Sequence, residues 1–327
     1  MKNIISILIF AVSILLVSCN NEDSIINRGI RETNAIDNLK HYNDSILKTR
    51  VTTRSPSLNT KVAFADCSGA ASGVVAGHKI GTALGLVTGG TGYFVSTIGC
   101  GVIWGAICSY MATNISNGEK NNINRIVDFL EISKDVVSNS IKTVPNVEDV
   151  TTIRRWRHPI CNNFTSNRNE YVDKIGLAHN NLLAGQLKID KRFISEMTVR
   201  TECKLPEIKA TKEDSLVFNK IINTDEFKNS FFQISNSIQK CFINGNFDAD
   251  KFFTENKLMS SKVEEAIKQY GELYLRYPQN IEDIEKITND YINIIEQSEE
   301  FTEEEKDILY SALNVSIYSP QLWNEYK

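Results

Sequence analysis

Hydrophobic and polar positions divide the chain into two unlike parts. Residues 61–118 are apolar and rich in glycine, and no Asp, Glu, Lys or Arg occurs between Ile80 and Gly118. From Asn121 onward, apolar residues recur three and four positions apart among polar ones. That spacing is typical of amphipathic helices. The sequence therefore predicts an all-α fold, with a helical hairpin at residues 61–118 followed by an antiparallel helical-bundle body at residues 119–327.

The apolar part contains a ladder of glycines that recur at every fourth position. A spacing of four advances about 400° around a helix, so these glycines form one slowly spiralling stripe. Each interior glycine costs a helix about 1 kcal/mol relative to alanine, and close packing against a second helix is the usual compensation. The expected packing residues are Gly69, Gly73, Gly77, Gly81, Gly85 and Gly89 in the first helix, and Gly101 and Gly105 in the second.

Two environments for this hairpin remain open. The second arm, Tyr93–Ile115, has the length of about 20 mostly apolar residues that a bilayer span needs. The first arm carries His78 and Lys79 near its middle. A lysine at the bilayer centre costs about 2.5–3.5 kcal/mol. The hairpin therefore either enters a membrane or a partner, or is buried in the protein's own body, and an apolar pattern alone does not separate these cases.

Apolar faces, caps and short connections predict the remaining helices. Thr302 and Glu305 have the spacing of a capping box. Phe193–Thr201 fits a strand or a helix. The predicted helices cover Ala35–Leu47, a segment from Ile123 to Val137, Tyr171–Leu187, Asp214–Asn223, Thr224–Ile243, Asp248–Tyr277, Asn280–Gln297 and Thr302–Tyr318.

The N-terminus has the pattern of an export signal. Lys2 precedes an apolar stretch, Ile4–Val17, that is too short for a stable membrane span. The signal ends in Leu16-Val17-Ser18-Cys19, which resembles the bacterial lipobox and implies that residues 1–18 are removed and Cys19 is lipidated. The polar, acidic residues after Cys19 resemble the tag that sends some lipoproteins to the cell surface. We expect a lipid-anchored protein of the outer membrane and cell envelope, with residues 19–60 as a flexible polar tether.

Two resemblances accompany the hairpin. A glycine zipper ahead of a polar helical body resembles glycine-zipper secreted proteins, including class II bacteriocin-like peptides that disturb target membranes. The chain is also similar to uncharacterised bacterial lipoproteins that pair such a zipper with a Gly-x-x-His-Asn element and a tryptophan near the C-terminus. The matching positions are Gly176, His179, Asn180 and Trp323.

Candidate chemistry is sparse. The net charge of −4 gives no basic face for nucleic acid. No nucleophile elbow, phosphate-binding loop, zinc-binding motif or dinucleotide fingerprint occurs, so we expect no catalytic residues, no metal and no cofactor, and rank an enzyme last. His179 has no paired ligand nearby and is expected to be structural. Among the cysteines, Cys67 and Cys108 could face each other across the hairpin.

These observations lead to two expectations for function. In the first, the glycine hairpin of an exported, lipid-anchored surface protein mediates membrane insertion or self-association. In the second, the protein is a passive scaffold or binding lipoprotein in which the hairpin is purely structural. The expected partners are a membrane, through the lipid anchor and in the first case through the hairpin, and a second copy or another protein.

Overall fold

The computed structural model describes residues 34–49, 58–85, 91–116, 123–143, 175–183, 208–210, 212–243, 246–277 and 281–325. Within these ranges the chain is almost entirely helical, which confirms the predicted all-α class. The signal peptide with Cys19, Gly89 and the segment Phe193–Thr201 lie outside the described residues, as does the side chain of Trp323.

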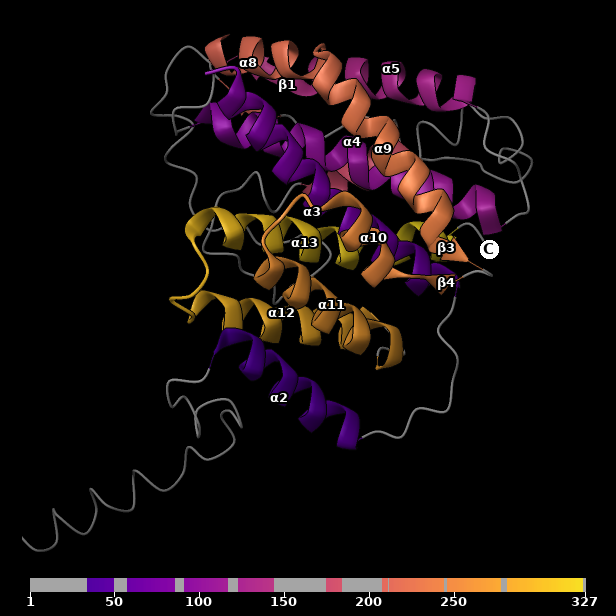
Figure 1. Ribbon diagram of the computed structural model, residues 1–327, viewed down its shortest axis with the longest axis vertical. Helices are drawn as coiled ribbons and strands as arrows, with labels where there is room; N and C mark the ends of the chain where they lie inside the picture. The colour runs from indigo at the N-terminus through magenta and orange to yellow at the C-terminus, as the bar shows by residue number, and fades with distance from the viewer. Residues whose placement is uncertain are drawn as a thin grey trace, which may run out of the picture.

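Two long helices, α3 (Leu58–Ala83) and α4 (Thr91–Ser116), form the centre of the molecule (Figure 1). Every residue from Val62 to Gly77 and from Gly99 to Asn114 is buried. Packed against α4 are α8 (Lys212–Ile222) and α9 (Asp225–Cys241), while α13 (Glu303–Glu325) packs against α3. The apolar, glycine-rich helices are thus enclosed by helices that have one polar face.

The far side of the body consists of α11 (Ser261–Arg276), α12 (Ile281–Glu296) and α2 (Ala35–Thr49). The α2 prediction is confirmed, although α2 falls within the segment expected to be a tether. Asn43 of α2 donates from its Nδ2 atom to the Gln269 carbonyl at 2.8 Å and accepts from the Tyr291 hydroxyl at 2.6 Å. Residues 35–49 are therefore held by polar contacts on α11 and α12.

Two helices differ from the prediction in their ends. The helix expected over Asp248–Tyr277 is two helices, α10 (Ala249–Asn256) and α11, because Lys257 is left-handed with φ 47° and Ser260 caps α11. In the other direction, α13 continues beyond Tyr318 through Pro320. A proline supplies no N–H to the carbonyl four residues earlier. The Tyr274 hydroxyl donates to that carbonyl, on Ser316, at 2.9 Å.

Short strands and one further helix complete the described parts. Helix α5 (Ile123–Ser140) leads into β1 (Ile141–Thr143), which pairs in parallel with β2 (Ile208–Ala210). Strands β3 (Phe242–Ile243) and β4 (Asn246–Phe247) pair antiparallel and turn the chain from α9 into α10. At the start of α13 the predicted capping box is confirmed, since the Glu305 N–H donates to Thr302 Oγ1 at 3.2 Å and the Thr302 N–H to Glu305 Oε2 at 3.0 Å.

Candidate functional site: the glycine hairpin and its buried carboxylate

The first two glycines of the ladder lie against α4. A Cβ atom added to Gly73 would be 2.5 Å from the Cys100 carbonyl oxygen and 2.8 Å from Trp104 Cβ. One added to Gly69 would be 2.3 Å from Cys108 Sγ. These separations are shorter than any real Cβ contact, so the two helices approach as closely as they do only because these positions carry no side chain.

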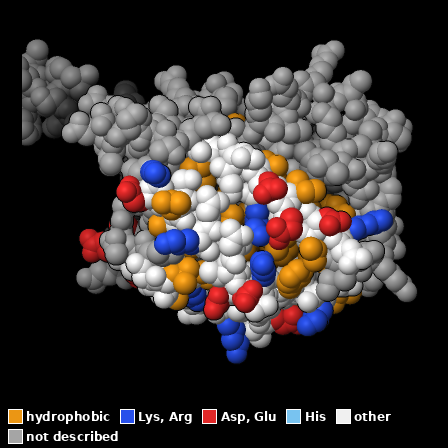
Figure 2. Space-filling model, turned by 90° about the horizontal axis from the view of Figure 1, so that it is seen from above, with side chains coloured by type: hydrophobic (Ala, Val, Ile, Leu, Met, Phe, Trp, Pro, Cys, Tyr) orange, Lys and Arg blue, Asp and Glu red, His pale blue; other side chains and the backbone are white. Residues whose placement is uncertain are grey.

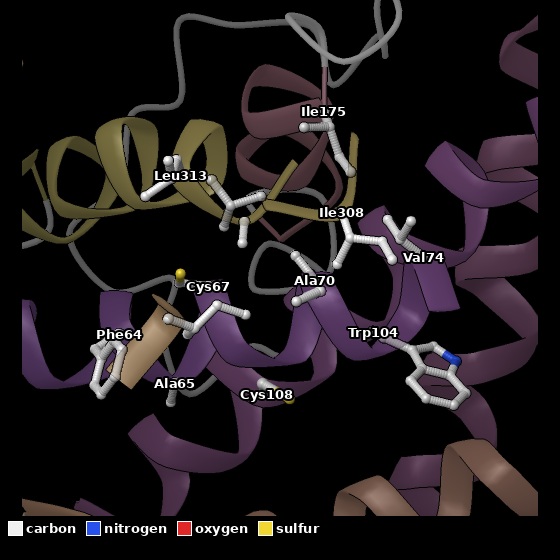
Figure 3. Close-up of a cluster of buried hydrophobic side chains, with 14 of the residues drawn as sticks. Phe64, Ala65, Cys67, Ala70, Val74, Trp104, Cys108, Ile175, Ile308 and Leu313 are labelled. Atoms are coloured by element: carbon white, nitrogen blue, oxygen red, sulfur yellow. The ribbon is translucent and has the colours of Figure 1, made fainter. Parts of the chain in front are cut away.

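The glycines of α4 face α3 and the helix at residues 175–183. A Cβ on Gly101 would lie 2.8 Å from Ile175 Cδ1 and 2.9 Å from Val74 Cγ2. One on Gly105 would lie 3.0 Å from His179 Cδ2. Figure 3 shows Ile175, Val74 and Ala70 converging where these helices meet α13. The hairpin is thus packed tightly on two sides by helices of its own chain.

The ladder ends sooner than its spacing predicts. Gly77 and Gly81 are buried on α3, as expected for the stripe. Gly85 does not continue it: this exposed residue follows the helix with a left-handed φ of 65°, and its N–H donates to the Thr82 carbonyl at 2.9 Å. The expectation that Gly85 packs against a second helix is therefore wrong, because glycine here serves to end the helix.

One carboxylate, that of Asp66, joins four segments inside this apolar centre. Ser109 of α4 donates to Asp66 Oδ2 at 2.6 Å, and Ser319 of α13 donates to the same atom. His179 Nε2 lies 3.7 Å from it. All four side chains are fully buried. A buried carboxylate is costly unless it is hydrogen-bonded, and here the two hydroxyl groups meet part of that requirement.

The Gly-x-x-His-Asn element docks residues 175–183 onto α13 and the hairpin. The Gly176 N–H donates to Asn314 Oδ1 at 2.8 Å, and a Cβ on Gly176 would lie 2.3 Å from the Tyr318 ring. Asn180 donates from Nδ2 to the Tyr318 carbonyl at 2.7 Å. Because the Asn180 amide nitrogen is used in this way, its oxygen, Oδ1, accepts a hydrogen bond from His179 Nδ1 at 2.9 Å. The other ring nitrogen of His179, Nε2, faces Asp66. The element is a set of packing and docking contacts.

The buried polar cluster is closed to solvent. The hydroxyl groups of Ser109 and Ser319 donate to the Asp66 carboxylate, and all three side chains are fully buried, so a substrate would reach them only if the surrounding helices separated. Burial lowers the pKa of His179 to about 4, against smaller opposing effects of its hydrogen bonds to Asn180 and to the Gly105 backbone. The imidazole is thus neutral near pH 7. Within the described ranges, no His, Cys, Asp and Glu group is placed to hold a metal ion.

The described cysteines are inert thiols. Cys67, Cys100, Cys108 and Cys241 are all free and buried, so the pairing of Cys67 with Cys108 across the hairpin is not formed. Burial raises the pKa of Cys67, Cys100 and Cys108 well above the ordinary thiol value, with Asp66 adding to the effect at Cys67 and Cys108. Such thiols react slowly, because the thiolate is the nucleophile.

In the described parts of the chain, exposed hydrophobic side chains are scattered over the surface. None of the helices in the described ranges is both long and apolar enough to cross a membrane. Figure 2 shows the face nearest α5 and α8, where hydrophobic side chains alternate with Lys, Arg, Asp and Glu. Large exposed hydrophobic residues in the described parts are single ones on separate elements, namely Leu84, Val127, Leu216 and Ile243.

Sequence reasoning found the glycines and the Gly-x-x-His-Asn element but missed the carboxylate that connects them. Asp66 precedes the ladder by three residues and is the last acidic residue before a long uncharged stretch, which is the signal that could have identified it. Comparisons of the chain with protein-family models, with curated proteins and with solved structures found no match.

Proposed function

We propose that this protein is an exported, lipid-anchored binding or scaffold protein, in which the glycine hairpin is the structural centre of a helical body. The observation that carries this proposal is where the glycines lie. Gly69 and Gly73 contact α4, and Gly101 and Gly105 contact α3 and residues 175–183. The close approach that a glycine stripe allows is already used within the chain, so these faces are not available to lipid or to a second copy.

The first test replaces Gly73, Gly77 and Gly81 together by leucine in the chain from residue 19 onward, with Cys19→Ser to keep it free of lipid. We expect loss of the cooperative thermal transition followed by circular dichroism, since three buried positions become overpacked. An unchanged melting temperature would contradict a structural hairpin. The lipid anchor has its own test: incorporation of labelled palmitate into the full-length chain, which Cys19→Ser abolishes if Cys19 is the attachment site.

Membrane insertion by the hairpin is the second candidate, favoured by the absence of any Asp, Glu, Lys or Arg from Ile80 to Gly118. Insertion would require α13, α8 and α9 to separate from the hairpin, exposing the buried Trp104 to lipid. The chain has three tryptophans, so Trp156→Phe with Trp323→Phe leaves Trp104 as the only reporter. Vesicles with brominated acyl chains should leave its fluorescence unchanged if the hairpin is structural. Quenching, with dye leakage from the same vesicles, would establish insertion instead.

A further inference from the structure

A groove of about 660 Å³ lies between α9 and α10 and is open to solvent. Its wall on α9 is formed by residues three and four positions apart, which places them on one helix face. This face lies beside the one that α9 buries in the core, which includes Phe231, Ile234 and Ile238. The α9 residues of the groove are Asn229, Phe232, Gln233, Asn236, Ser237 and Lys240.

The floor of the groove is a small hydrogen-bonded unit. Asn256 of α10 donates from Nδ2 to Ser237 Oγ at 2.9 Å and to the Phe252 carbonyl at 2.6 Å, and Ser237 donates to Glu255 Oε2 at 3.1 Å. Asn256 and Ser237 are 93% and 97% buried. The Asn256 Oδ1 atom is buried and receives no hydrogen bond from the described residues. These hydrogen bonds fix the side chains of Ser237 and Asn256 in the floor of the groove, where they give it a polar surface.

The rim offers amides, one aromatic ring and charges that offset each other. Asn229, Gln233 and Asn236 are exposed, and each amide supplies both donors and an acceptor. Lys240 Nζ lies 3.9 Å from Glu255 Oε2, so neither sign of charge dominates. Phe232 is partly buried and gives the groove an apolar surface.

We propose that this groove binds a neutral saccharide of one to three rings. This inference rests on the proposed role as a binding protein and names its ligand class. Sugar hydroxyl groups donate and accept at once, as amide groups do, and the C–H face of a sugar ring packs on an aromatic side chain. Because the charges of Lys240 and Glu255 offset each other, the groove favours neither an anion nor a cation. The volume falls within the range of about 300–1,000 Å³ typical of small-molecule sites.

The test uses the chain from residue 19 onward with Cys19→Ser, saturation-transfer NMR and four neutral trisaccharides: maltotriose, cellotriose, mannotriose and the trimer of N-acetylglucosamine. Triglycine is included at the same concentration as a peptide of zero net charge. We expect transfer to at least one trisaccharide and none to triglycine. The double variant Gln233→Ala with Asn236→Ala should weaken that binding about tenfold or more, through the loss of two hydrogen-bonding side chains.

Gln239→Ala is the matched control, because Gln239 is an exposed amide on α9 that does not line the groove. It should leave binding unchanged. Both variants replace exposed residues, so unchanged circular dichroism spectra are expected and loss of binding is not attributed to unfolding. Absence of transfer to all four trisaccharides, transfer to triglycine alone, or equal binding by the double variant would each overturn the saccharide assignment. None of these outcomes affects the structural role of the hairpin, which the glycine variants test separately.

Discussion

Gly73→Ala is the sharpest test of how the two central helices fit together. An added Cβ would lie 2.5 Å from the Cys100 carbonyl oxygen and 2.9 Å from its carbonyl carbon. These atoms belong to the backbone in the middle of α4, so no side-chain rotation relieves the overlap. Overpacking a core typically costs about 1–3 kcal/mol, and the rigid obstacle here places the cost at the upper end.

A second effect acts in the opposite direction. Alanine is a better helix former than glycine by about 1 kcal/mol. The net destabilisation expected for Gly73→Ala is therefore about 2 kcal/mol, which lowers the melting temperature by about 3 °C in a chain of this size. Thermal and urea unfolding followed by circular dichroism measure both quantities. Thr82→Ala, at an exposed position of the same helix, should change the free energy of unfolding by less than about 0.5 kcal/mol.

An increase in stability on Gly73→Ala would contradict the close approach of α3 and α4. If α3 and α4 had room for a methyl group, Gly73→Ala would keep only the gain in helix propensity and raise stability by about 1 kcal/mol. Equal stability of the Gly73 and Thr82 variants would also contradict the close approach, because the first position alone faces a backbone carbonyl.

Three further predictions concern the contacts around Asp66. Asp66→Ala should cost about 3 kcal/mol or more in urea unfolding, because the buried hydroxyls of Ser109 and Ser319 lose their acceptor; adding Ser109→Ala to it should cost less than the two single changes summed. Gly176→Ala should undock residues 175–183 by displacing the Tyr318 ring, seen as faster amide hydrogen exchange there with α12 unaffected. The pKa of His179 is lowered to about 4 from 6.5, so the unfolded chain binds the extra proton between these values and stability should fall as pH drops from 6.5 towards 4. His179→Gln should remove a slope of up to about 1.4 kcal/mol per pH unit in that window, and an unchanged slope would show that other groups cause it.

The local elements were readable from the sequence, whereas the surroundings of the hairpin were not. Spacing and caps predicted α2, α5, α9, α12 and the start of α13, since these signals lie within each segment. The burial of the hairpin depends on partners far along the chain, as Ser319 is 253 residues from Asp66. An apolar segment has the same sequence pattern whether it lies in a bilayer or in a protein core, so the pattern alone did not decide between them.

Two helix ends show why local signals fail. No Gly or Pro marks the end of α10, where the left-handed residue is Lys257. Pro320 is the opposite case, because a proline normally ends a helix but α13 continues through it. The Tyr274 hydroxyl of α11 donates to the Ser316 carbonyl, which Pro320 leaves without its helical N–H donor. In both cases a tertiary contact or a cap outweighs the preference of the residue itself.

The hydrogen bond between Asp66 and Ser319 also has a consequence for folding during synthesis, because it cannot form until Ser319 has been made. Synthesis at about 5–20 residues per second separates these two residues by roughly 10–50 s, because they are 253 positions apart in the chain. During that interval α3 and α4 exist without α13, the helix that covers one side of them. The side of α3 that α13 covers therefore stays open until that helix is made, and a stop codon shortly before Glu303 would leave this apolar side open permanently.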